Sequence, residues 1–206
     1  MKKRLILFSL GIFIFVVFVS FFLMAQTPIG PIQAKFQSSK QVFAKDGTLK
    51  SEQVTFEDYI QDSNGNSYRN IEIIVSSSGL RKSIKTIDLV REHRSYLIDE
   101  DNKRITISDG LPTSLGRNPP PPPDLEKRMY LGRPCAVITD SEIGIEIWID
   151  TELGLWLYLH QEQSTLEGGK IVTIKRATQL TTDQEIDTSL FSTPDLSEYD
   201  VIYPNK

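Results

Sequence analysis

The sequence predicts a mostly β protein, a curved antiparallel meander or half-barrel of about ten strands preceded by one N-terminal hydrophobic helix. Three observations predict this class. Apolar and polar residues alternate with a period of two along much of residues 32–180. Short turn signals such as Asp46-Gly47 separate these segments, and such short connections suit antiparallel pairs. Only the uncharged run of residues 5–25 has the length and character of a long helix.

The apolar run of residues 5–25 predicts entry into the secretory route. As a helix it would be about 31 Å long, close to the thickness of a bilayer's hydrocarbon core. It is either a cleaved signal peptide ending at Ala25 or a retained membrane anchor. The basic residues at positions 2–4 and the length of the run favour the anchor, and Leu23 fits a cleavage site poorly. Residues 26–206 are then one domain of the cell envelope, outside the cytoplasm.

Composition excludes several classes of function. The chain has 23 basic and 27 acidic residues, and residues 26–206 carry a formal net charge of −7. Nucleic acid is therefore not an expected partner, and neither is broad adhesion to anionic lipid. The single cysteine, Cys135, cannot form an intramolecular disulfide and is expected to pack as a small buried hydrophobe.

The first half of the exported part contains a series of strands joined by tight turns. These strands are expected at residues 32–44, 54–60, 68–75, 80–90, 95–99 and 104–108. Polar and glycine-containing turns separate them, at residues 46–47, 62–66, 76–79 and 100–103.

The second half shows clearer alternation. Strands are expected at residues 133–140, 145–150, 155–160 and 170–180. The segment from residue 183 onward is expected to be an ordered extension, in which Leu190 and Phe191 pack on the sheet before Pro194 ends it.

Residues 109–130 break the strand pattern. They include a proline-rich loop at 109–123 with five consecutive prolines, and proline cannot donate to a sheet ladder. A loop of this length is either a binding element or an exposed spacer between two halves of the sheet. Residues 124–130 are compatible with one short helix.

The hairpin of residues 145–160 has two different faces. One face carries the aliphatic side chains Ile145, Ile147, Ile149, Leu155, Leu157 and Leu159. The other carries Trp148, Trp156 and Tyr158 among Glu146, Asp150 and His160. The aliphatic face has to be buried, and few helices are predicted to cover the aromatic one. The sheet therefore curls around an apolar cavity, or it forms a sandwich whose faces are both filled by protein.

Three short motifs resemble one known family. They are Ile145-Glu-Ile-Trp-Ile-Asp150 with Glu152-Leu-Gly-Leu155, Ile186-Asp-Thr-Ser-Leu-Phe-Ser-Thr-Pro194, and Tyr96-Leu-Ile-Asp99 followed by Arg104-Ile-Thr-Ile107. Together they are similar to the lipoprotein-carrier superfamily (LolA/LolB-like), which includes sigma-E regulator-type periplasmic domains. The resemblance implies an open half-barrel that shields a lipid or an acylated polypeptide from water.

The chain also departs from that family. Carriers usually begin with a helix, whereas residues 27–31 lead almost directly into the first strand. The basic residue that governs ligand release in the family has no clear counterpart here. A retained anchor would prevent shuttling, so a tethered member would receive or sense its ligand.

Signals for catalysis are weak. His93 and His160 are far apart and lack metal-ligand spacing, and no nucleophile elbow, phosphate loop or dinucleotide fingerprint is present. We therefore expect no enzyme activity, no cofactor and no metal site.

The leading hypothesis is a non-catalytic extracytoplasmic domain that binds lipid or lipoprotein acyl chains. Trp148, Trp156 and Tyr158 would line the site, with loop 111–123 near its mouth. If the aliphatic face is the concave one, Ile147 and Leu157 line it instead.

The rival hypothesis is a membrane-anchored protein-interaction or stress-sensing module. It would meet an envelope protein through a sheet edge or through the proline-rich loop, because polyproline segments dock in aromatic grooves. In both hypotheses residues 5–25 provide the contact with the membrane.

Overall fold

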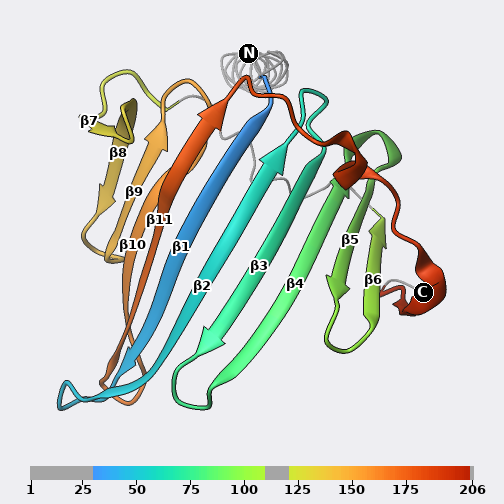
Figure 1. Ribbon diagram of the computed structural model, residues 1–206. Coiled ribbons are helices and arrows are strands. Elements are labelled where there is room, and N and C mark those ends of the chain that lie inside the picture. Colours follow the sequence, from blue (N-terminus) through green and yellow to red (C-terminus); the bar gives the residue numbers. More distant parts are fainter. Residues whose placement is uncertain (1–29, 110–120, 205–206) are drawn as a thin grey trace, which may run out of the picture.

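One open, curved sheet of twelve strands forms the protein, and almost no helix accompanies it (Figure 1). The computed structural model describes residues 30–109 and 121–204. The strands are β1 (Ile32–Phe43), β2 (Leu49–Gln61), β3 (Ser67–Val75), β4 (Leu80–Leu89), β5 (Arg94–Asp99), β6 (Arg104–Asp109), β7 (Lys127–Tyr130), β8 (Arg133–Asp140), β9 (Ile145–Asp150), β10 (Trp156–Ser164), β11 (Lys170–Thr182) and β12 (Asp200–Ile202). The mostly β class is confirmed, with two more strands than expected.

The sheet consists of two antiparallel meanders joined side by side. Its strand order is β12-β6-β5-β4-β3-β2-β1-β11-β10-β9-β8-β7. The two meanders meet where β1 pairs with β11, from Ile32 opposite Thr182 to Phe43 opposite Lys170. A single meander was therefore too simple an expectation. Pairing β1 with β11 satisfies backbone groups that would otherwise lie along two open edges.

Three short 3₁₀ helices complete the described elements: η1 (Val90–Glu92), η2 (Thr188–Phe191) and η3 (Leu196–Glu198). The short helix expected within residues 124–130 is wrong, because this segment contains β7. β7 forms a hairpin with β8 through Leu131 and Gly132, whose φ angles are 51° and 76°. Two positive φ angles match the twist of a tight hairpin, and this turn outweighs the local helical tendency.

Two expectations fall outside the described residues. They are the N-terminal helix of residues 1–25 and most of the proline-rich loop at 109–123. Within residues 30–109 and 121–204, no helix has the length and apolar character needed to cross a bilayer.

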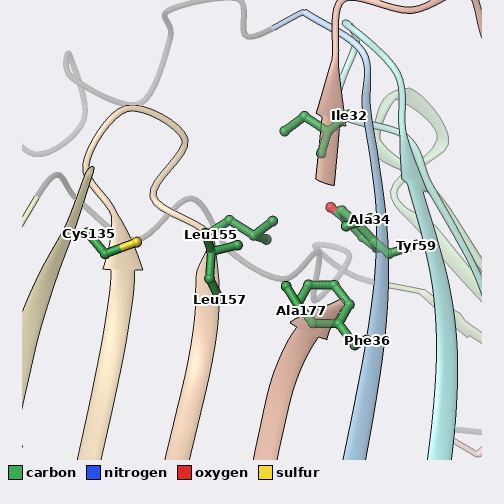
Figure 2. Packing of buried hydrophobic residues seen from close by; sticks show 8 residues of the cluster. All are labelled: Ile32, Ala34, Phe36, Tyr59, Cys135, Leu155, Leu157 and Ala177. Carbon is green, nitrogen blue, oxygen red and sulfur yellow. The ribbon is translucent and has the colours of Figure 1, made fainter. Parts of the chain in front are cut away.

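The first hydrophobic cluster joins residues of β1, β2, β10 and β11 to Cys135 of β8 and Leu155 of the β9–β10 turn, and Tyr130 and Trp148 pack against it (Figure 2). Its buried members are Ile32, Ala34, Phe36, Tyr59, Cys135, Leu155, Leu157 and Ala177. Cys135 is buried and free, as expected for a small core side chain.

The second cluster lies on the opposite face of the sheet. Its members are Ile87, Leu89, Tyr96, Ile98, Ile105 and Ile107, on β4, β5 and β6. The register aligns Tyr59 of the first cluster with Arg69 and Thr86. Ile87 follows Thr86 in β4, so it points to the other side.

The C-terminal segment covers this second cluster and holds it in place. Phe191, Leu196, Tyr199 and Val201 pack against it, which confirms that Phe191 docks on the sheet. β12 then pairs in parallel with β6 and forms the edge of the sheet. The Tyr199 hydroxyl donates to Glu100 Oε2 at 2.9 Å, and Lys85 Nζ donates to Glu100 Oε1 at 2.9 Å. These two bonds, the one from Lys85 first, lower the pKa of Glu100.

Replacing Phe191 with alanine tests whether the C-terminal segment is part of the core. We expect Phe191→Ala to lower the free energy of unfolding by about 2 kcal/mol, because the ring leaves a partly filled gap over β4–β6. Urea denaturation measures the change. Leu166→Ala, at a fully exposed turn position, is the control and should change stability by less than about 0.5 kcal/mol. Equal effects of the two substitutions would show that the segment does not stabilise the sheet.

Candidate ligand-binding site

Three ring side chains gather on one face at the β7 end of the sheet, and we call Tyr130, Trp148 and Tyr158 the aromatic row. The rings of Tyr130 and Trp148 meet edge to face, with centroids 5.7 Å apart. Those of Trp148 and Tyr158 lie 5.0 Å apart. All three side chains are half-buried, so part of this ring surface remains open to solvent. Such ring pairs stabilise the folded state by more than the burial of their apolar surface alone.

The aromatic row depends on a sharp curl of the sheet. The Tyr130 hydroxyl donates to the carbonyl oxygen of Ala177 at 2.8 Å. Tyr130 lies on β7 and Ala177 on β11, four strands away, which in a flat sheet would be roughly 19 Å. A tyrosine side chain cannot reach that far. The β7–β10 end therefore bends back toward β11, and burial there raises the pKa of Tyr130.

Three charged side chains flank the row: Arg128, Glu126 and Glu146. The guanidinium of Arg128 lies over the Trp148 ring, 5.1 Å from its centroid. Glu146 Oε1 accepts from the indole Nε1 of Trp148 at 2.8 Å and from Arg128 Nη1 at 3.4 Å. Arg128 also donates to Glu126 at 2.8 Å. These groups therefore fix the position of Trp148 and satisfy one another.

Arg176 continues the row onto β11. It lies opposite Tyr158 on one side and Gln37 on the other. Its Nη2 donates to Gln37 Oε1 at 3.1 Å. Burial and Glu146 raise the pKa of the Tyr158 hydroxyl, and the nearby Arg176 opposes that rise.

A groove of about 320 Å³ lies on the same face. Gln33, Lys35 and Gln37 alternate along β1, so their side chains share one side of the sheet. Gln37 meets Arg176, whereas Gln33 and Lys35 line the groove. Its remaining lining residues are Ala34, Asp58, Tyr59, Ile60, Tyr68, Asn70 and Gln179. The groove and the aromatic row are thus two parts of one surface, joined at Arg176.

Trp156 does not join the aromatic row. It pairs with Ile149, whereas Tyr158 pairs with Trp148, so the register shifts at Leu157. This bulge interrupts the alternation expected through Trp156, which lies apart with 39% of its surface exposed.

Ile147 and Leu157 are packed inside the protein. Leu157 is 0% exposed and belongs to the first hydrophobic cluster. Ile147 is 8% exposed and lies opposite Leu159. Of the five side chains expected to form a site, Trp148 and Tyr158 are therefore the two that the structure brings together.

The other face carries a charge network that the sequence did not reveal. Lys175 donates to Glu57 across β1, and Arg69 lies 4.0 Å from Glu57 and 3.9 Å from Asp88. Ser67 Oγ also donates to Asp88 at 2.8 Å. Each of these residues alone is an ordinary polar strand position, and only the long-range register assembles them. Two cations and two anions balance, which allows the charges to be partly buried.

The histidines take ordinary positions. His93 is an exposed residue with a φ of 51° at the end of η1, and His160 lies on β10 with Nε2 3.6 Å from Glu162. Among the residues that the structure describes, no group of three His, Cys, Asp or Glu side chains could hold a metal.

The family-like motif around Asp150 has a structural role. Asp150 is 0% exposed, and its carboxylate accepts hydrogen bonds from the Arg133 guanidinium. It also accepts from the backbone N–H groups of Glu152 at 2.9 Å and Leu153 at 2.8 Å. The carboxylate thus closes the turn between β9 and β10 that leads into the bulge.

Comparison with known proteins gives one structural likeness. No protein-family model matches the sequence, and no curated protein does. Among solved structures, the chain is similar to a domain described as an outer membrane lipoprotein-sorting protein domain from Vibrio parahaemolyticus. The two are 11% identical, with a TM-score of 0.32, and the match covers 82% of this chain and 92% of that one. At this identity and TM-score, the function has to be argued from the residues of this chain.

Asp150→Asn tests the buried turn carboxylate. We expect a loss of about 3 kcal/mol of unfolding free energy, because the buried group at position 150 loses its ion pair with Arg133, which then has only the exposed carboxylate of Glu152 as a charged partner. Urea denaturation provides the measurement. Asp140→Asn is the matched control: Asp140 also accepts from two turn N–H groups, those of Glu142 and Ile143, but it is exposed. It should cost less than about 0.5 kcal/mol. A small effect at both positions would contradict the role of Asp150.

The reactivity of Cys135 tests the burial of the same region. Burial raises the pKa of its thiol to about 11, so the reactive thiolate is scarce at pH 8. We expect a disulfide reagent such as dithionitrobenzoate to modify the native chain very slowly and the urea-unfolded chain at once. The release of thionitrobenzoate measures both rates. Rapid modification of the native chain would mean that the first cluster is open to solvent.

Proposed function

We propose that this protein is a non-catalytic domain of the cell envelope that binds an apolar ligand, lipid or lipoprotein acyl chains, on its curved sheet. The observation that carries the proposal is the half-open aromatic row beside a groove on the same face. Residues 26–206 would form the binding domain. Residues 1–25 would direct or anchor it.

The ligand would lie against Trp148 and Tyr158. Ring surface that remains half-open to water at the curled end of a sheet is a favourable place for an acyl chain, since covering it releases water. Trp156 would contribute less, because it lies apart from the row. Ile147 and Leu157 would support it from within, because both are buried.

The groove extends this surface without making it an enzyme site. A volume of about 320 Å³ is within the usual range for a small-molecule site. Its lining combines Tyr68 and Ile60 with amides and the ion pair of Lys35 and Asp58, whose atoms are 3.0 Å apart. Such a lining suits the polar part of an amphiphile. The description of the Vibrio domain concerns that protein, and we take from it only the type of ligand to test first.

Lipid that co-purifies with the full chain tests this function. We expect extracted wild-type protein to release lipid that mass spectrometry identifies. Trp148→Ala should reduce the amount about tenfold, because it removes the central ring of the row. Trp156→Ala should reduce it less than about threefold, since that ring lies apart from the row. Circular dichroism checks that both variants fold. Wild-type protein that carries no lipid and binds none when offered would refute the proposal.

An edge strand gives the rival protein-interaction role a specific test. β7 is an edge of the sheet, and its Met129 is 66% exposed. A partner could add a strand there. A photocrosslinker at Met129 that captures an envelope protein, combined with an absence of bound lipid, would favour that role.

A further inference from the structure

We propose that the ligand is an anionic amphiphile whose phosphate or carboxylate head group binds Arg176, while its apolar chain lies along the aromatic row. This inference rests on the proposed function and names the class of ligand. It also assigns a binding role to a residue that no motif pointed to.

Arg176 differs from the other cations on this face. Arg128 has Glu126 and Glu146, and Lys35 has Asp58. Arg176 is exposed on β11, and in the described part of the chain its only hydrogen-bonded partner is the neutral amide of Gln37. No carboxylate among the described residues forms an ion pair with it. A guanidinium in this setting can accept an anion without breaking an existing ion pair, and its planar fork suits phosphate and carboxylate oxygens.

Two neutral donors flank the guanidinium. Tyr158 lies directly opposite Arg176 on β10, and no hydrogen bond of its hydroxyl occurs within the described residues. That hydroxyl is protonated at neutral pH, as in any tyrosine, and burial raises the pKa of Tyr158 further. Gln37 lies opposite on β1, with an amide that can turn its NH₂ group toward an anion. Tyr158, Arg176 and Gln37 thus lie side by side on three neighbouring strands.

The aromatic row next to Arg176 offers an apolar surface for the chain of the ligand. Tyr158 stacks against Trp148 at 5.0 Å, and Trp148 meets Tyr130 at 5.7 Å. The rings therefore continue from Tyr158, beside Arg176, through Trp148 to Tyr130, whose hydroxyl bonds back to Ala177 of β11. An anion with an attached acyl chain can engage both parts, whereas a free anion engages only Arg176 and a neutral lipid only the rings. Because the charge of Arg176 and the apolar rings lie side by side, we expect an anionic amphiphile to bind more tightly than a free anion or a neutral lipid.

A pair of probes with the same chain tests the head group. Binding of dodecyl phosphate and of dodecyl maltoside to the full chain is measured by titration calorimetry below their micelle concentrations. Inorganic phosphate is the third probe. Arg176→Gln keeps a hydrogen-bonding group next to Gln37 but removes the charge. Arg81→Gln, at an exposed arginine of β4, is the matched control.

We expect Arg176→Gln to weaken dodecyl phosphate binding by about tenfold or more, the usual loss for one charge-assisted contact. Tyr158→Phe should weaken it by roughly threefold, the loss of a neutral hydrogen bond. Dodecyl maltoside binding should change little in Arg176→Gln, and Arg81→Gln should affect neither probe.

The outcomes separate this inference from the proposed function. If both probes bind equally well and Arg176→Gln changes neither, the anionic class is wrong while apolar binding stands. If inorganic phosphate binds as tightly as dodecyl phosphate, the site takes a free anion and the amphiphile is wrong. If no probe binds to the wild-type chain, both the inference and the proposed function fail.

Discussion

The pairing of β1 with β11 is the constraint on which the rest of the structure depends. It converts two meanders, each too narrow to bury much surface, into one sheet with a continuous register. Contacts on both faces cross this junction or end beside it. Lys175 reaches Glu57 across it, Arg176 meets Gln37 at it, and Tyr130 bonds to the backbone of β11.

The sheet divides its apolar surface between its two sides. The first cluster gathers around β1 and β11 and extends to Cys135 of β8, where Tyr130 and Trp148 pack against it, and the second lies over β4–β6 under the C-terminal segment. The two clusters therefore fill only part of the sheet's surface and leave polar or partly exposed regions beside them. A single layer of strands stays folded in this way without a second sheet, and one of its half-open regions is the surface of Trp148, Tyr158 and Arg176.

Local patterns in the sequence predicted most strands because period-two alternation and turn chemistry are local properties. Long-range pairing was not predictable, since no local sequence pattern indicates that β1 pairs with β11 or that β12 pairs with β6. The helix expected at residues 124–130 was wrong for the same reason. Pairing of β7 with β8 in a hairpin determines the conformation of that segment. Alternation placed Trp148 and Tyr158 together correctly, but it could not show the bulge that separates Trp156. Arg176 gave no local signal, since it is only in three dimensions that no carboxylate of the described residues forms an ion pair with it.

The junction of β1 and β11 also has a consequence for how the chain assembles. Ile32 and Thr182 are partners although nearly the whole domain lies between them. During synthesis or export, β1 emerges early. The backbone groups on one edge of β1 stay unpaired until β11 has also emerged and pairs with it. Contacts of such long sequence separation slow folding and expose strand edges to other chains. The centre of β1 is polar and contains a lysine: Gln37, Ser38, Ser39, Lys40 and Gln41. This composition keeps the unpaired edge soluble and disfavours its pairing with other chains.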